Sequence, residues 1–127
     1  MAVTHGTATR TAVADTVVDR VDLGSGLSAG YLEITTSGNS VLVTCSFSTT
    51  AFGSASSGTA TANAISNGTA SAAGTAAKAK VKDKDGNVIF EGTVTATGGG
   101  GNVELATTSI TVGMVVSVSA CTYVAPS

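Results

Sequence analysis

The sequence predicts a mainly β protein, an antiparallel β-sandwich or jelly-roll-like barrel of about seven or eight short strands with one N-terminal helix. Three observations support this fold class. Thr and Val are abundant and suit pleated, half-buried strands. From Tyr31 onward, apolar and polar residues alternate, with turn signals about every ten residues. A helical repeat is confined to residues 7–23. We therefore expect one domain over residues 1–127, with residues 1–24 as a helix or arm and residues 25–127 as the β body.

A repeat of valines predicts the helix. Val13, Val17 and Val21 recur every four residues and form one apolar stripe. Charged residues are expected on the opposite side, namely Arg10, Asp15, Asp19, Arg20 and Asp22. Because β-branched residues disfavour an isolated helix, the stripe must pack on something, either this chain's own sheet or a neighbouring subunit. Val13, Val17 and Val21 are therefore candidate partner-contact residues.

The strand predictions follow from period-two alternation bounded by turn residues. Residues 31–35 and 41–47 flank Ser37-Gly38-Asn39-Ser40 and predict a hairpin. The last predicted strand, residues 114–124, is the longest and is apolar on most of both faces. We expect it to be central in the sheet, or covered by the helix or another chain. The remaining predicted strands are residues 59–65, 77–82, 88–97, 103–105 and 109–112.

Lysines alternate with small apolar residues along one predicted strand, which gives it a basic outer face. Lys78, Lys80 and Lys82 form this stripe, and Lys84 lies just beyond it. One interpretation is an edge strand whose lysines discourage sheet-to-sheet aggregation. The other is a contact patch for an acidic surface on a partner, and the two are compatible. Lys78, Lys80, Lys82 and Lys84 are the second set of candidate partner-contact residues.

The residues needed for nucleophilic catalysis are not gathered in any recognisable pattern. His5 is the one histidine and precedes the helix, and no Gly-x-Ser-x-Gly elbow is present. Neither Cys45 nor Cys121 has a basic neighbour that would lower its pKa. Both cysteines fall in predicted strands and are interpreted as small buried apolar residues, not as a disulfide. We predict no enzyme activity, no catalytic residues and no cofactor.

Residues 83–87, Asp-Lys-Asp-Gly-Asn, are the best candidate for a metal site because they begin like a calcium-binding loop. The pattern then fails, since position six is Val88 and position twelve is Val94. The same residues suit a tight turn between two strands, because Asp, Asn and Gly tolerate turn geometry. We predict a turn and no metal site.

Composition and charge exclude several partners. Six Lys and Arg against eight Asp and Glu give a net charge of −2, so no basic excess points to nucleic acid. Apolar runs are far shorter than the roughly 20 residues of a membrane helix. The N-terminus lacks a secretory signal, so synthesis in the cytoplasm is expected. Only 11% of residues are charged, which indicates that part of the surface is in contact with a partner. We also expect self-association as a dimer or trimer.

Two stretches, residues 8–19 (ATRTAVADTVVD) and residues 47–63 (FSTTAFGSASSGTATAN), resemble small virion proteins of tailed bacteriophages. The resemblance extends more loosely to the C-terminal strands and covers most of the chain. It implies a capsid cement or decoration protein on the exterior of the virion, with the major capsid protein and neighbouring copies of itself as partners. No catalytic or binding residues are carried over with it.

The alternative is a tail-associated or host-facing receptor-binding module, an adhesin. Such modules usually display aromatic residues on loops, and Phe52 is the one aromatic residue expected on a loop here.

Overall fold

The computed structural model describes residues 5–125 and is mainly β, with one α-helix, as the sequence predicts. The first four residues of the predicted N-terminal arm, and residues 126–127, lie outside the described residues. The elements are α1 (Thr7–Asp19), the 3-10 turn η1 (Arg20–Asp22), β1 (Tyr31–Thr35), β2 (Val41–Ser46), β3 (Thr59–Thr61), β4 (Gly68–Thr69), β5 (Gly74–Thr75), β6 (Lys78–Lys82), β7 (Val88–Ala96), β8 (Val103–Leu105), β9 (Ser109–Ile110), β10 (Val115–Val116) and β11 (Val118–Val124).

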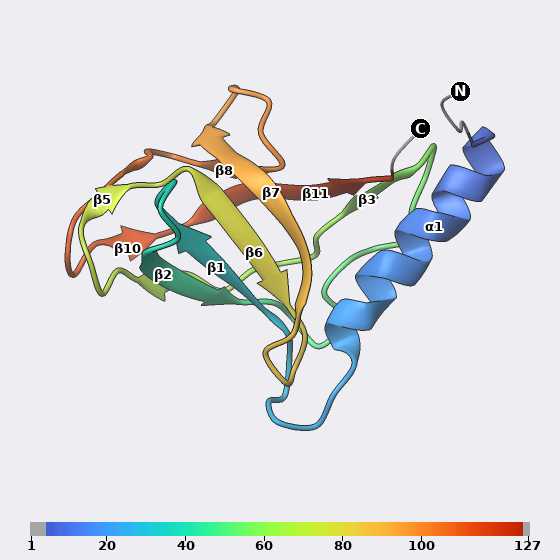
Figure 1. The fold of residues 1–127 in the computed structure, drawn as a ribbon, viewed down its shortest axis with the longest axis horizontal. Helices are drawn as coiled ribbons and strands as arrows, with labels where there is room; N and C mark the ends of the chain where they lie inside the picture. Colours follow the sequence, from blue (N-terminus) through green and yellow to red (C-terminus); the bar gives the residue numbers. More distant parts are fainter. Residues whose placement is uncertain (1–4, 126–127) are drawn as a thin grey trace.

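Seven strands form the main sheet, in the order β2-β1-β6-β7-β8-β11-β3 (Figure 1). The predicted hairpin is confirmed, since β1 pairs antiparallel with β2 across residues 36–40. The expectation of purely antiparallel pairing is wrong at one place, because β7 and β8 run parallel. Between these strands the chain doubles back through its glycine run, and Gly98 and Gly100 take positive φ values of 89° and 83°. Glycine adopts such angles without steric cost, which permits the short return.

One segment, residues 59–71, joins the two edges of the sheet. Its first part, β3, pairs with β11, and its last part, β4, pairs with β10. The same segment runs along the opposite edge strand β2, where the Ser66 and Ser71 amides donate to the carbonyl oxygens of Ser46 and Leu42. The sheet therefore curls into a barrel-like body in place of two stacked sheets. A small ribbon of β5 and β9 lies beside it.

The core fills the inside of this curled sheet. On β1 and β6 alternate residues face inward, as the burial of Leu32 and Ile34 on β1 and of Ala79 and Val81 on β6 shows. The register between β1 and β2 shifts by one residue after Ile34, so neighbouring residues of β2 are both buried there. The core continues into the helix, whose Val18 and Val21 belong to the same apolar cluster.

The helix packs on its own chain, but through a face displaced from the predicted stripe. Ala14, Val18 and Val21 are the buried residues, whereas Val13 and Val17 are half-exposed. The displacement arises because two residues predicted to face solvent bind the connection that follows β2. Asp15 accepts a hydrogen bond from the Ala55 amide at 2.7 Å, and Asp22 accepts one from the Ala51 amide at 2.9 Å. These bonds satisfy backbone donors that would otherwise lack partners.

The C-terminal strand differs from its prediction in length and orientation. It is divided into β10 and β11, and the nine-residue β7 is the longest strand. Its central position is confirmed, because β11 lies between β8 and β3. The buried side chain of β11 is Cys121, whereas Val124 is exposed. The alternation is interrupted where the register against β8 shifts between Val118 and Ala120.

Candidate functional site: surfaces for contact with a partner

The predicted lysine stripe lies on the outer face of β6, but β6 is not an edge strand. It is paired on both sides, with β1 and with β7, so the edge-strand interpretation is wrong. The alternation expected from the sequence is confirmed. Lys78, Lys80 and Lys82 are half-buried on one face, and the residues between them are buried on the other.

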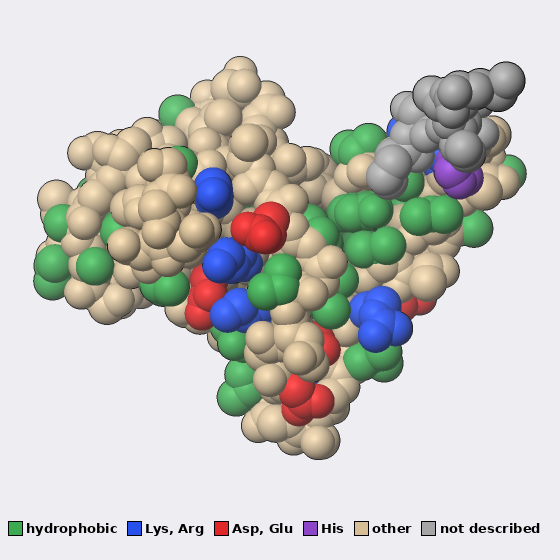
Figure 2. Space-filling model, in the orientation of Figure 1, with side chains coloured by type: hydrophobic (Ala, Val, Ile, Leu, Met, Phe, Trp, Pro, Cys, Tyr) green, Lys and Arg blue, Asp and Glu red, His purple; other side chains and the backbone are tan. Residues whose placement is uncertain are grey.

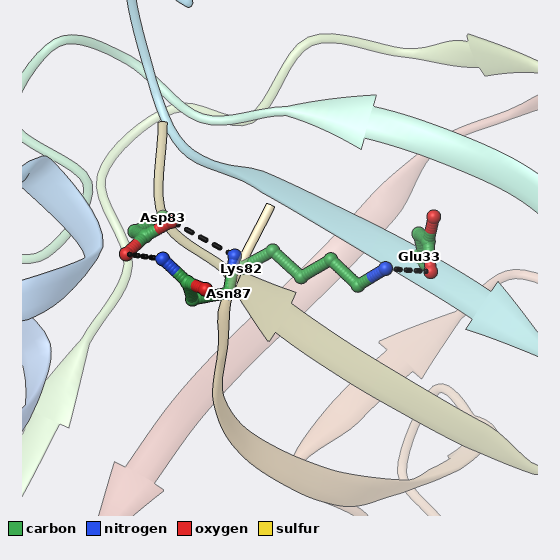
Figure 3. A network of polar contacts seen from close by, with 4 residues as sticks. All are labelled: Glu33, Lys82, Asp83 and Asn87. Carbon is green, nitrogen blue, oxygen red and sulfur yellow. Dashed lines mark hydrogen bonds and ion pairs between the residues drawn. The ribbon is translucent and has the colours of Figure 1, made fainter. Parts of the chain in front are cut away.

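Acidic residues from the neighbouring strands offset the charge of this stripe. Lys80 lies between Glu33 of β1 and Glu91 of β7 in the register of the sheet. The Nζ atom of Lys82 forms an ion pair with Glu33 at 2.8 Å (Figure 3). The same atom lies 5.8 Å from the centre of the Tyr31 ring. The hydrogen bond that Lys82 donates to Glu33 raises the pKa of Lys82. The outer face of β6 therefore carries charges of both signs. The carboxylates weaken the positive electrostatic potential that would attract an acidic partner.

Lys84 lies in the turn after β6, and the structure confirms the predicted turn. The carboxylate of Asp83 accepts hydrogen bonds from the backbone amide of Asn87 at 2.9 Å and from the Asn87 side chain (Figure 3). It also accepts one from the Asp85 amide at 2.9 Å. The carboxylate of Asp85 accepts hydrogen bonds from the Gly26 and Ser25 amides of the loop after the helix. These carboxylates therefore bind backbone groups and hold two loops together.

Asp83 makes stability depend on pH. Burial alone would raise the pKa of its carboxyl group, but the donors of Asn87 and Asp85 favour the ionised form, and the pKa lies below its usual value. A carboxyl with a lowered folded-state pKa stabilises the fold above its unfolded pKa, and this contribution is lost as the pH falls through the folded pKa. We expect the difference in unfolding free energy between wild type and Asp83→Asn to shrink when urea titrations are moved from neutral pH to below about pH 4. A difference that is constant with pH would contradict this.

The half-exposed valines of the predicted helix stripe face outward. Val13 and Val17, with Thr9, Ala12 and Thr16, line a shallow apolar groove of about 260 Å³ on the outer side of α1. Val21, the third member of the predicted stripe, is fully buried against the body. Two of the three predicted helix residues are thus available to a partner, and the third is a core residue.

Both cysteines are buried thiols. Burial raises the pKa of Cys121 to about 12 and also raises the pKa of Cys45. Thiols that resist ionisation are poor nucleophiles and poor metal ligands. Within residues 5–125, no three His, Cys, Asp or Glu side chains gather closely enough to hold a metal ion.

A surface without charges is the feature that the sequence analysis missed. Residues 34–77 and 105–127 contain no Asp, Glu, Lys, Arg or His, and together they supply β2 to β5 and β9 to β11. Among them β4 pairs with β10, β5 with β9 and β3 with β11, and β3 and β11 extend across the body to α1. The end of the molecule that carries β5 and β10, on the left in Figures 1 and 2, shows no acidic or basic side chain on the face drawn. The sequence did hold a signal for this surface, namely the two long segments without charged residues.

The exposed residues of β2, β4 and β10 and of the turn before β10 form what we call the uncharged surface. Val112 is 69% exposed in that turn, and Val115 is 64% exposed on β10. Residues 70 and 71 connect the strands, because the Ser71 amide donates to Leu42 of β2 and the Gly113 amide donates to Ala70. The members of the uncharged surface are Val41, Thr44, Ser46, Thr69, Val112, Gly113 and Val115.

The glycine tip, residues 98–101, is an ordered turn. The Gly98 and Gly100 amides donate to the two carboxylate oxygens of Glu104, and the Gly101 amide donates to the Thr95 hydroxyl. Its backbone donors are therefore already satisfied within the chain.

Comparison of the sequence with protein-family models and curated proteins, and of the fold with solved structures, finds no match. Within the part of the chain that the structure describes, the helix is too short and too polar to cross a bilayer.

Proposed function

We propose that this protein is a bacteriophage capsid cement protein, which binds the outside of the assembled major capsid shell and stabilises it by bridging subunits. The uncharged surface carries this proposal, because exposed Val side chains among uncharged Thr and Ser are suited to burial against another protein. The resemblance of residues 8–19 and 47–63 to small virion proteins supports the same role.

Cement activity requires only binding energy. A protein that binds the assembled shell and not the free subunits shifts the equilibrium toward the shell by mass action. If each copy contacts more than one subunit, a modest interface per contact is sufficient, because the second contact is effectively intramolecular. A rigid, curled sheet with an attached helix can hold two contact surfaces at a fixed separation. The outer groove of α1 and the uncharged surface are the two that the structure offers.

The receptor-binding alternative has less support. Phe52, the one aromatic residue expected on a loop, is buried and packs against Phe47, with ring centres 5.5 Å apart, so it is not exposed to a receptor.

The decisive experiment adds the purified protein to capsids that lack it and counts bound copies by quantitative mass spectrometry. We expect on the order of hundreds of copies per particle and an increase in the temperature at which the shell opens. A dozen or fewer copies would contradict the cement role and support a tail or vertex position.

A paired variant tests the helix groove in the same assay. Val13→Lys with Val17→Lys places charges in the groove without touching the buried face of α1. Val88→Lys is the matched control, because it makes the same chemical change at a valine that is 48% exposed at the start of β7, outside the groove. Loss of capsid binding in the first variant alone would assign the groove to the shell.

A further inference from the structure

We propose that Asn67 is a site of spontaneous deamidation that the fold keeps closed, and that it reacts only when residues 59–71 detach from the edge strand β2. The inference goes beyond the proposed function and does not depend on it, because it concerns the purified chain. Its starting point is Asn67-Gly68, the one place in the sequence where glycine follows asparagine. Because glycine has no side chain to obstruct its own amide nitrogen, an asparagine before it reacts faster than one before a larger residue.

The reaction needs no enzyme, metal or oxidant. The Gly68 amide nitrogen loses its proton to base and attacks Cγ of Asn67, and the C–N bond of the side-chain amide breaks to release ammonia. The product is a cyclic succinimide. Water then opens this ring at either of its carbonyl carbons, which yields aspartate or isoaspartate. The overall change consumes one water and releases one ammonia. In isoaspartate the main chain passes through the former side chain and is longer by one carbon.

The structure holds the nucleophile of this reaction in place. Gly68 opens β4, is buried, and lies opposite Val116 of β10. Its amide donates a hydrogen bond to the sulfur of Cys45 on β2. Because the amide must give up this buried bond before it loses its proton, the folded chain disfavours the first step.

Contacts on both sides of Asn67 also fix the torsion angles that the attack requires. The Ser66 amide donates to the carbonyl oxygen of Ser46 at 2.9 Å. A Cβ atom on Gly68 would overlap the carbonyl oxygen of Thr44, so the backbone here lies directly against β2. Attack requires rotation about the bond between Cα and the carbonyl carbon of Asn67, and this rotation would move Gly68 out of its contact. The Asn67 side chain is exposed, so the contact with β2, and not burial from water, protects the site.

An isoaspartate at residue 67 would prevent the sheet from closing again. The extra main-chain carbon shifts Gly68 along the chain relative to Ser66, so the two residues cannot both keep their places against β2. Gly68 has no free space on the side of Thr44, and a close-packed contact does not absorb such a shift. An opening that is normally reversible therefore becomes permanent in a modified chain.

Peptide mass spectrometry of the purified chain, incubated at mildly alkaline pH, measures the conversion of Asn67. We expect the rate in urea above the unfolding transition to exceed the native rate by at least about 100-fold, because the native chain reacts only from its rare open state. Asn67→Gln is the chemical control, because glutamine forms the corresponding larger ring far more slowly. Equal rates in the native and unfolded chains, or no conversion in urea, would overturn the proposal.

Val116→Ala tests whether the closure by β4 controls the reaction. Val116 is 4% exposed and lies opposite Gly68, so its truncation should weaken this pairing and raise the native rate by about 10-fold. Val94→Ala is the matched control, the same change at a valine that is 6% exposed on β7, and its rate should stay close to that of wild type. Equal acceleration in both variants would show that the reaction follows global unfolding, against the proposal.

Circular dichroism establishes that each variant is folded. Should Val116→Ala not fold, labelling of Cys45 in wild type by a thiol reagent takes its place, because the sulfur contacts the same Gly68 amide. Labelling of Cys45 and conversion of Asn67 should then rise together with urea below the unfolding transition. Labelling that rises without conversion would contradict a shared opening.

The permanence of the opening is tested on the converted chain. Asn67→Asp is the matched control, because it carries the same charge without the extra main-chain carbon. We expect Asn67→Asp to melt like wild type, since the side chain at this position is exposed. The refolded isoaspartate form, separated by chromatography, should melt about 5–10 °C lower. Equal melting temperatures would show that the sheet closes in spite of the modification.

Discussion

Replacement of Leu32 with alanine is expected to lower the free energy of unfolding by about 2–5 kcal/mol, the range observed when a buried leucine leaves a cavity. Leu32 is fully buried at the centre of the curled sheet. It lies opposite Cys45 of β2 and Val81 of β6, which are both buried on the same inner face. Since strands on both sides are fixed by backbone hydrogen bonds, the surrounding structure cannot collapse into the space, and the lost contacts are not recovered.

Urea unfolding followed by circular dichroism measures this loss, and Leu27→Ala is the matched control. Leu27 is 53% exposed in the loop before β1, so the same chemical change there should alter stability by no more than about 0.5 kcal/mol. The slope of the transition should stay constant between the variants if both unfold in one step. Equal destabilisation at the two positions would show that the inside of the sheet is not packed as described.

Replacement of Gly68 with alanine is expected to lower the free energy of unfolding by about 2–3 kcal/mol, because the new methyl group has no space. Gly68 opens β4 where residues 59–71 cross edge strand β2. A Cβ atom there would overlap the carbonyl oxygen of Thr44 and lie 2.7 Å from Cγ2 of Val43. The obstruction is mainly backbone, so relief requires β4 to move away from β2, and the closure of the sheet would loosen.

Thermal unfolding of Gly68→Ala and of Gly38→Ala separates this steric effect from the general consequences of replacing glycine. A Cβ atom at Gly38 would meet only the hydroxyl oxygen of Thr36, at 3.8 Å, which is an ordinary contact. The change at Gly38 should therefore be neutral or slightly stabilising, because alanine restricts the unfolded chain. If Gly68→Ala were also neutral, the contact between β4 and β2 could not be close.

Local patterns in the sequence predicted the local elements well. The hairpin of β1 and β2 follows from two alternating runs around Ser37-Gly38-Asn39-Ser40, and Asn39 takes the positive φ of 69° that such a turn requires. The helix was placed correctly because Ala14 and Val18 directly follow Val13 and Val17. Adjacent apolar residues repeated every four positions form one stripe on a helix, whereas they would point to opposite faces of a strand. Both predictions depend only on residues close together in the chain.

What could not be predicted depends on residues distant in the chain. The face that α1 turns toward the body is set by hydrogen bonds of Asp15 and Asp22. Their donors are backbone amides 40 and 29 residues away in the sequence. The strands that neighbour β6 are known only once the order of strands in the sheet is known. The ion pair of Lys82 with Glu33 could therefore not be predicted from the sequence. The parallel pair of β7 and β8 was missed because most parallel connections need a dozen or more residues. The glycine run removes that requirement.

Residues 59–71 join both edges of the sheet, and this arrangement constrains when the chain can fold during synthesis. β3 and β4 are made early, but their partners β11 and β10 come after residue 114. Until the ribosome has delivered those partners, residues 59–71 hold unpaired strand edges. These strands lie within residues 34–77, which carry no charge to keep nascent chains apart. Pairing across such separations is slow, since loop closure precedes any gain from the contacts. The demand on chaperones is therefore greatest between the synthesis of β3 and that of β11.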